Sequence, residues 1–377
     1  MSYIARNDPS IIGRWWHEVD RGLIGTTLIL ILAGVMVMFT GSAQEALQSD
    51  DPLLRFSIRK AVLVLAGLGL ILLLSLAHPK QIEQLTPLGF MLALAFMLSI
   101  FVAGAGENGA VRWVTVPGLG FTPQPSEFAK PMLVLMLAYC LARIPSWGFA
   151  RALATAFGCF ASIATLIFIQ PDVSQTIFLT LVFLALVYLA GLSFQWVLVL
   201  ISLGGVSAYT IYRVSERVRE RVDGFITFLQ GQENDNPTQI EMIADAFREG
   251  GVEGVGFGEG HLKTKIPEVK NDMPLAIIGE ETGIIGALVV FGLFFLVWSR
   301  TQARLKSLTG DFQRLAAAGL AFLFVGQALT NILYTVGILP PTGITLPFFS
   351  DGGSSLIASS IIIGLLLSMT RQRGANG

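Results

Sequence analysis

Long stretches without a charged side chain alternate with short polar connections along this chain. Six stretches contain no Asp, Glu, Lys or Arg, namely residues 22–44, 61–79, 84–106, 152–171, 282–299 and 352–370. A helix of about 20 apolar residues crosses the roughly 30 Å hydrocarbon core of a bilayer. Each stretch therefore predicts one membrane-spanning helix.

Three further regions complete the predicted set of spans. Residues 173–212 are twice the length of one span, and the break at Gly191-Leu192-Ser193 divides them in two. Residues 315–350 hold one span that ends near 339, followed by a Pro-rich loop. Residues 131–142 are short, and we expect that span to extend back through Phe128. The total is ten spans, which predicts an all-α polytopic membrane protein with a single domain over 1–377.

Lys and Arg gather on one side of these spans. The side that carries both ends of the chain holds Arg6, Arg14, Arg21, Lys80, Arg143, Arg151, Arg300, Arg304, Lys306, Arg314, Arg371 and Arg373. The short loops opposite hold only Arg55, Arg59, Lys60, Arg112 and Lys130. Because cytoplasmic loops are enriched in Lys and Arg, we expect 1–21 and 371–377 in the cytoplasm. Residues 213–272 then form one large extracytoplasmic loop, and Arg59 and Lys60 are exceptions to the rule.

Composition agrees with a membrane protein and excludes several other classes. Of 377 residues, 53% are hydrophobic and 14% are charged, whereas soluble proteins carry about 25% charge. A net charge of −1 gives no sign of a nucleic-acid partner. Cys140 and Cys159 lie in apolar runs and predict buried thiols rather than a disulfide. Residues 1–21 are polar throughout, which argues against a signal peptide.

Polar residues recur where the predicted spans begin or end. Glu127 and Lys130 are three residues apart, so they share one helix face and can neutralise each other. The pair either lets a helix begin at the bilayer edge or lines a polar cavity, and both interpretations stay open. Asp172 follows Gln170-Pro171, and Asp272 directly precedes the eighth span. An N-cap is the favoured interpretation of each aspartate, and for Asp272 the alternative is a carboxylate base facing an outer cavity.

Three other segments are unusual for a membrane protein. Six glycines within residues 250–260 predict a loop whose backbone approaches a ligand closely, although no nucleotide-binding fingerprint surrounds them. Glu280 and Glu281 lie about 12 Å along the following helix, where at least one must face protein, a cation or water. The arginines of 213–221 favour a surface helix with alternating charges, with a phosphate grip as the alternative.

Taken together and in this order, the motifs resemble those of the SEDS family of membrane glycosyltransferases. The motifs are Asn-Gly-Ala-x-Arg-Trp, Gln-Pro-Ser-Glu-x-x-Lys, Gln-Pro-Asp, Gly-x-Gly-x-Gly followed by Ile-Pro-Glu-x-x-x-Asp, Gly-Glu-Glu-x-Gly and Leu-Pro-Phe-x-Ser-x-Gly-Gly-Ser-Ser. The resemblance covers most of the chain. It implies a bacterial inner-membrane enzyme that polymerises lipid II into peptidoglycan. The segment ending at Ser350 looks more like the division branch (FtsW) than the elongation branch (RodA).

The resemblance also implies roles for residues. Asp272 falls on the family's essential acid and is the expected catalytic base. The expected substrate-binding residues are Arg112, Glu127, Lys130, Asp172, Glu281, Ser350, Gly352 and Gly353. The sequence departs from the family at Met273-Pro274-Leu275, which follow the acid, and at Asp351, where Tyr is usual.

The implied partners are lipid II, a class B penicillin-binding protein transpeptidase and other division proteins. A Mg²⁺ or Mn²⁺ ion bound with the pyrophosphate is possible on chemical grounds, although no ligand cluster announces a metal site. Three alternatives remain open at this point: a lipid II flippase, a non-catalytic division scaffold and an elongation polymerase.

Overall fold

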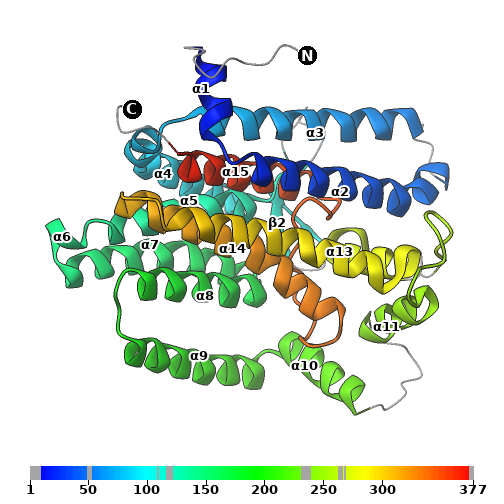
Figure 1. Cartoon of the computed structure of the whole chain (residues 1–377). Coiled ribbons are helices and arrows are strands. Elements are labelled where there is room, and N and C mark those ends of the chain that lie inside the picture. Colours follow the sequence, from blue (N-terminus) through cyan, green and yellow to red (C-terminus); the bar gives the residue numbers. More distant parts are fainter. Residues whose placement is uncertain are drawn as a thin grey trace.

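The computed structural model describes residues 10–48, 53–107, 110–115, 122–230, 239–261, 266 and 269–372. Arg6, Asn108, Pro267, Glu268 and Arg373 lie outside the described residues. Long helices that run in one common direction form most of the molecule (Figure 1). The predicted all-α class is therefore confirmed.

Each of the ten predicted spans corresponds to a helix. They are α2 (Arg21–Gln48), α3 (Leu53–Leu76), α4 (Pro79–Ala103), α5 (Pro125–Leu141), α7 (Phe149–Ile169), α8 (Val173–Leu189), α9 (Phe194–Val214), α13 (Pro274–Leu305), α14 (Asp311–Thr335) and α15 (Gly353–Thr370). Within the described residues, α2, α3, α4, α7, α13, α14 and α15 are long and apolar enough to cross a membrane. The chain is thus a membrane protein, and the number ten stays a prediction.

Shorter elements connect these helices. They are α1 (Ile11–Glu18), α6 (Ile144–Trp147), α10 (Glu216–Leu229), α11 (Gln239–Gly250), α12 (Val269–Asp272) and the strands β1 (Gly104–Glu107) and β2 (Ala110–Val114). The predicted span 84–106 was wrong at its end, because the chain leaves the helix after Ala103. Residues Gly104–Glu107 instead pair with Ala110–Val114 in an antiparallel hairpin that satisfies their backbone groups.

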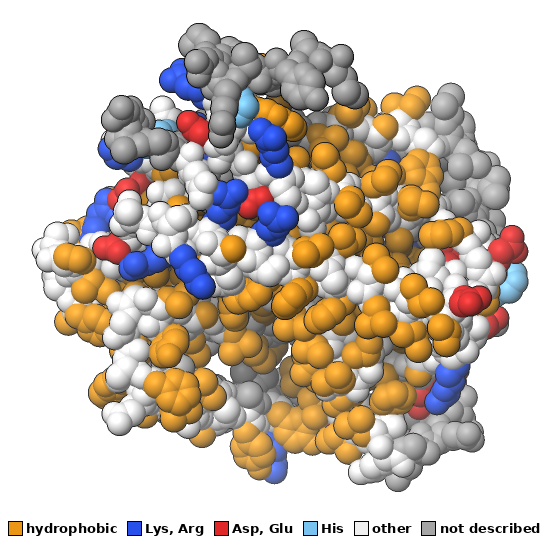
Figure 2. All heavy atoms as spheres, in the orientation of Figure 1, with side chains coloured by type: hydrophobic (Ala, Val, Ile, Leu, Met, Phe, Trp, Pro, Cys, Tyr) orange, Lys and Arg blue, Asp and Glu red, His pale blue; other side chains and the backbone are white. Residues whose placement is uncertain are grey.

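The core lies along α5, α14 and α15. In the most apolar 18-residue stretch of α15, 83% of the residues are buried. In the corresponding stretch of α3 only 6% are buried, although α3 packs along α15. Figure 2 shows hydrophobic side chains over the middle of the visible face and charged side chains toward its two sides. The charged regions therefore lie at the two ends of the helices, where a membrane protein meets water, and the apolar middle of the bundle is the part that would face lipid.

The two ends of the bundle differ. At one end, called the terminal end here, α1 is tied to the end of α15, because Arg371 Nε donates to Glu18 Oε2 at 2.7 Å. Asp20, between α1 and α2, is tied to α13, because Arg304 Nε donates to its Oδ2 at 2.9 Å. The opposite end, called the loop end, carries the hairpin, α11, α12 and residues 340–352 (Figure 1). Most of the predicted site residues lie at the loop end.

The Gly-rich segment is fastened to a break in α13. Gly283 interrupts the helix with φ 65° and ψ −163°. The N–H groups of Ile284 and Ile285 donate to the carbonyls of Gly251 and Val252, at 3.0 and 3.3 Å. In return, the N–H groups of Val255 and Gly256 donate to the carbonyls of Glu280 and Glu281, both at 3.0 Å. The loop therefore satisfies the four backbone groups that the break exposes.

Glycine is required where the two backbones meet. A Cβ on Gly254 would lie 2.2 Å from the Glu281 carbonyl oxygen, and one on Gly283 would lie 2.3 Å from the Val252 carbonyl oxygen. Both residues also have positive φ, which glycine adopts without strain. The backbone of this loop was predicted to approach a ligand closely, and the structure shows that it approaches the backbone of α13.

We expect Gly283→Ala to destabilise the protein by more than the roughly 1–3 kcal/mol that backbone strain alone costs, because the new methyl also displaces the loop. Gly292→Ala is the matched control on the same helix, since a Cβ there meets nothing within 4 Å and alanine favours a helix. Thermal unfolding in detergent measures both. Equal melting temperatures for the two variants would contradict the proposed role of the break.

Candidate functional site

A cluster of paired charges lies where α5 and α8 begin, and we call it the hairpin cluster (Arg112, Glu127, Lys130, Asp172, Gln175). Lys130 Nζ and Glu127 Oε1 are 2.6 Å apart, and both side chains are buried. Gln175 Nε2 also donates to Glu127 Oε1, at 3.4 Å. The predicted mutual neutralisation of Glu127 and Lys130 is confirmed.

Asp172 has two roles within this cluster. Its Oδ1 accepts a hydrogen bond from the Gln175 N–H at 3.1 Å, so the N-cap prediction is confirmed. Its Oδ2 lies 3.3 Å from Arg112 NH1, and Arg112 also donates to the carbonyls of Gln170 and Pro171. Burial raises the pKa of Asp172, against the opposing effects of Arg112, Lys130 and Arg221.

Asp272 does not cap α13. It ends the short helix α12, and the N-cap of α13 is Met273, which is fully buried and makes no side-chain cap hydrogen bond. The cap prediction for Asp272 was wrong because the Met273 N–H already donates to the Val269 carbonyl, which moves the helix boundary one residue on. Pro274 occupies the first turn of α13, as the sequence predicted.

The Asp272 backbone is fixed by a second element. Asn331 Nδ2, on α14, donates to the Asp272 carbonyl at 2.6 Å and to the Ile344 carbonyl at 2.7 Å. The half-buried Asp272 carboxylate lies beside Gly343, where an added Cβ would be 3.5 Å from Oδ2. One asparagine therefore holds the α12 turn and the 340–352 loop together around this carboxylate.

Lys60 and Asp351 form an ion pair at the loop end. Their side chains are 12% and 17% exposed. Lys60 Nζ also donates to the Asp351 carbonyl at 3.0 Å, and the Asp351 N–H donates to the Lys270 carbonyl at 2.9 Å. We call Lys60, Lys270, Asp272, Asn331 and Asp351 the Asp272 cluster. The pair accounts for two features of the sequence, a lysine on the unexpected side of the membrane and an aspartate at the family's Tyr position.

The beginning of α15 joins the two clusters. Ser354 Oγ accepts a hydrogen bond from the Gln124 N–H at 2.9 Å, which ties α15 to the first turn of α5. Ser350 Oγ accepts one from the Leu346 N–H at 2.9 Å and is 1% exposed. Gly352 is the N-cap of α15 and Gly353 its first residue, and both are half-buried.

The remaining predicted residues lie apart from these contacts. Glu281 is 2% exposed and its carbonyl accepts from Gly256, which places it beneath the Gly-rich segment. The predicted surface helix of 213–221 is confirmed only from Glu216, where α10 begins, because Arg213 belongs to α9 and Ser215 is the N-cap of α10. Of its arginines, Arg221 is exposed and acts electrostatically on Asp172.

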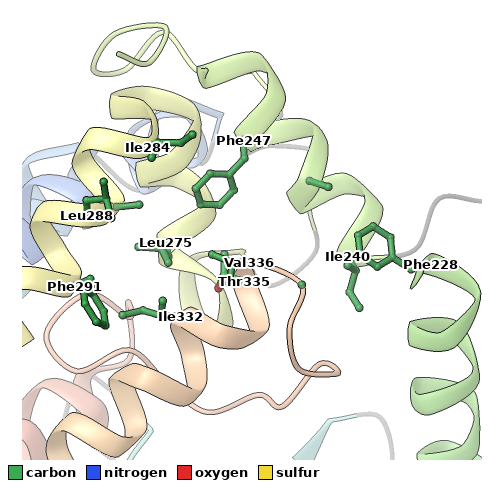
Figure 3. Close-up of a pocket in the computed structure, with 13 residues that line it drawn as sticks. Phe228, Ile240, Phe247, Leu275, Ile284, Leu288, Phe291, Ile332, Thr335 and Val336 are labelled. Atoms are coloured by element: carbon green, nitrogen blue, oxygen red, sulfur yellow. The ribbon is translucent and has the colours of Figure 1, made fainter. Parts of the chain in front are cut away.

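An apolar pocket of about 560 Å³ lies between α10, α11, α13 and α14 at the loop end (Figure 3). Its lining residues are Phe228, Ile240, Ala244, Phe247, Leu275, Ile284, Ala287, Leu288, Phe291, Ile332, Thr335, Val336 and Gly337. Leu275 lies in the first turn of α13, three residues beyond Asp272 at the end of α12, so the pocket begins close to the carboxylate in the chain. The sequence analysis missed this pocket, although apolar residues at helical spacing in 239–250 were an available signal.

The expected Mg²⁺ or Mn²⁺ ion, bound with the pyrophosphate, stays a prediction. Among the described residues, no three His, Cys, Asp or Glu side chains gather where they could hold an ion. We therefore assign no step to a protein-bound metal.

Comparison with known proteins identifies relatives that share this architecture. The family model of cell cycle proteins that groups FtsW, RodA and SpoVE matches residues 21–375. The probable peptidoglycan glycosyltransferase FtsW of Caulobacter vibrioides is 34% identical, over 99% of this chain and 95% of that protein. The corresponding protein of Halomonas elongata is 32% identical, over 99% and 96%.

Solved structures agree with these matches. A chain of a peptidoglycan synthase complex that coordinates polymerization and crosslinking superposes with a TM-score of 0.76. It is 25% identical, and the match covers 93% of this chain and 97% of that one. Thermus thermophilus RodA, a rod shape determining protein, gives 0.68 at 25% identity, over 95% and 99%.

We expect Lys60→Met and Asp351→Asn each to cost about 3 kcal/mol of stability, since each removes one partner of a largely buried ion pair. The double variant should be more stable than the sum of the two losses predicts. Unfolding of the four proteins in detergent gives the coupling energy. The exposed pair Arg314–Asp311, 3.0 Å apart, is the control and should show almost no coupling. Additive losses at Lys60 and Asp351 would contradict the pairing.

Proposed function

The chain belongs to the FtsW, RodA and SpoVE family of cell cycle proteins, and on that footing we propose that it is a peptidoglycan glycosyltransferase that polymerises lipid II for the division wall. Full-length similarity to curated FtsW proteins supports the activity and the division branch. We place it in the bacterial cytoplasmic membrane. The terminal end, rich in arginine, would face the cytoplasm and the loop end the outside.

The observation that carries the proposal is the position of Asp272. It lies half-buried at the loop end on a backbone held by Asn331, and the Lys60–Asp351 and Arg112–Asp172 pairs lie at the same end. A carboxylate at the edge of an apolar region suits general-base work, because partial desolvation makes it a better proton acceptor. The acceptor sugar of lipid II would present its 4-hydroxyl to this carboxylate.

The proposed reaction is a single inverting displacement. The acceptor 4-hydroxyl oxygen attacks the anomeric carbon of the donor sugar, and a β-1,4 bond forms. The α bond from that carbon to the pyrophosphate oxygen breaks, and the electron pair leaves with undecaprenyl pyrophosphate. The hydroxyl proton passes to Asp272. Charge thus develops on the pyrophosphate, where pre-placed cations stabilise the transition state most.

Arg112, Lys130 and Arg221 are the cations we propose for that charge. Arg112 and Lys130 are held by Asp172 and Glu127, so they are positioned before substrate arrives. Arg221 is exposed on α10 and acts on the same carboxylate, Asp172. Glu127 and Asp172 would act as positioning residues for these cations, and Ser350, Gly352 and Gly353 would shape the loop beside the acceptor. For Glu281, beneath the Gly-rich segment, we propose a structural contribution to the site.

The alternatives are less well supported. A lipid II flippase needs polar access from both faces, whereas the proposed residues gather at the loop end. A purely structural division scaffold would not need the Asp272 carboxylate. We propose a class B penicillin-binding protein as the partner, because the solved relative belongs to a complex that couples polymerization to crosslinking.

Asp272→Asn is expected to lower the polymerisation rate by about 10²–10⁴-fold, the usual contribution of a general base, with an unchanged melting temperature. Polymer length from labelled lipid II, made by purified protein, is the readout. Asp245→Asn is the control, since Asp245 is an exposed acid on α11 paired with Arg248. Normal polymer from Asp272→Asn would refute the base. Lipid transport in sealed vesicles without polymer would favour the flippase.

We also propose that the apolar pocket holds part of the polyprenyl tail. Its lining is almost entirely hydrocarbon, and it adjoins the turn that carries Asp272. The headgroup and the first isoprene units of one lipid could therefore contact both places at once.

Ala287→Trp should fill the pocket and raise the lipid II concentration needed for half-maximal rate roughly tenfold, with the maximal rate little changed, since excluding only two buried methylene groups of the tail costs about 1.6 kcal/mol of binding. Gly292→Trp, outside the pocket lining on the same helix, is the control. The measurement is the polymerisation rate of the purified protein, without a transpeptidase partner, as a function of lipid II concentration. An unchanged concentration dependence, together with loss of transpeptidase co-purification, would assign the pocket to the partner instead.

A further inference from the structure

A group of residues at the terminal end has no part in the proposed reaction. It is formed by α1, the first turn of α2 and the last turns of α13, and we call it the α1 corner. Figure 1 shows α1 at this end, lying across the direction of the long helices, and Figure 2 shows blue side chains gathered around a few red ones there. A short helix in that orientation is typical of the membrane surface.

Positive charge exceeds negative charge at the α1 corner. The Asp20 carboxylate forms ion pairs with two arginines, with Arg304 Nε at 2.9 Å and Arg300 NH1 at 3.6 Å. Although burial opposes it, these arginines and the Leu23 N–H hold the pKa of Asp20 below its usual value, so it is ionised at neutral pH. Arg14 and Arg21 are exposed and form no ion pair with a described carboxylate.

Contacts to neighbouring residues orient two of these guanidinium groups. Arg21 lies over the Trp16 ring, 4.9 Å from its centroid, and donates to the Trp16 carbonyl at 3.3 Å. Arg300 lies directly over the backbone of Gly22, where an added Cβ would be 2.4 Å from the guanidinium carbon. Gly22 follows Arg21 in the chain, so both arginines lie at the first turn of α2.

Apolar side chains continue from this point toward the middle of the membrane. On α2, Leu28 and Leu32 are 50% and 63% exposed, and at 1.5 Å per residue they lie about 10 and 17 Å below Arg21. On α13, Phe295 is 57% exposed and lies five residues, about 7.5 Å along the helix, below Arg300. At the surface, Ile12 of α1 is 65% exposed. Charge at the headgroup level thus lies above hydrocarbon on two adjacent helices.

We propose that the α1 corner binds an anionic phospholipid of the inner leaflet. The phosphate would lie between Arg21 and Arg300, which bind phosphate oxygens through paired N–H groups. The acyl chains would lie along Leu28, Leu32 and Phe295, and Trp16 would sit at the headgroup level. A soluble phosphate compound could use the same arginines but would leave these apolar side chains without a role.

Lipid retention tests the proposal. The purified protein is equilibrated in mixed micelles of phosphatidylcholine and phosphatidylglycerol, exchanged into detergent, and its bound lipids are quantified by mass spectrometry. The wild type should retain phosphatidylglycerol over phosphatidylcholine. Arg21→Gln with Arg300→Gln should lose this preference by roughly tenfold or more, because each basic residue contributes about a factor of five at a membrane surface.

The controls separate a specific site from general charge. Arg314→Gln removes an exposed arginine from the same end, paired within α14 to Asp311, and should leave retention unchanged. Arg21→Gln alone keeps the Asp20 pairs and should show about half of the effect on a logarithmic scale. Excess inorganic phosphate should not displace the lipid. Equal losses in Arg314→Gln, or displacement by phosphate, would overturn the lipid assignment.

Discussion

The loop end depends on the pairing of charges in a region with little water. Lys60, Arg112 and Lys130 lie in or beside the short loops of this end, and each is paired with a carboxylate, of Asp351, Asp172 and Glu127 respectively. Two of the pairs join elements distant in sequence, and the third lies within one turn of α5. A buried pair is costly to form and more costly to break, because the remaining charge has no solvent. These pairs therefore fix the geometry of the surrounding backbone.

The same end contains a second constraint, made only of backbone. The break at Gly283 exposes carbonyl and N–H groups inside the bundle, and the Gly-rich segment satisfies them reciprocally. This fastens α11 and the segment after it to α13, whose first turn follows Asp272. The carboxylate is thereby held between a charged framework on one side and a hydrogen-bonded framework on the other. The pocket beside Leu275 completes an arrangement suited to a substrate with a charged head and a long apolar tail.

The sequence predicted much of this and missed parts for identifiable reasons. Charge-free stretches located the helices, and the Glu127–Lys130 spacing predicted a pair, because both signals are local. The Lys60–Asp351 pair spans 291 positions, so no local pattern could announce it. The cap predicted at Asp272 failed because the four-residue helix α12 shifts the boundary by one residue. Glycine content predicted close approach in 250–260 but could not say that the approached surface is the protein's own helix.

The pH dependence of kcat/KM for lipid II polymerisation tests the central claim most directly, because it reports the ionisation of the free enzyme's base. Profiles from about pH 4 to about pH 8 are compared for the wild type, Asp272→Glu and Glu127→Asp. The account predicts an acid limb that moves in Asp272→Glu and stays in place in Glu127→Asp, where the carboxylate only positions Lys130. The account would be contradicted if the acid limb stayed in place in Asp272→Glu and moved in Glu127→Asp.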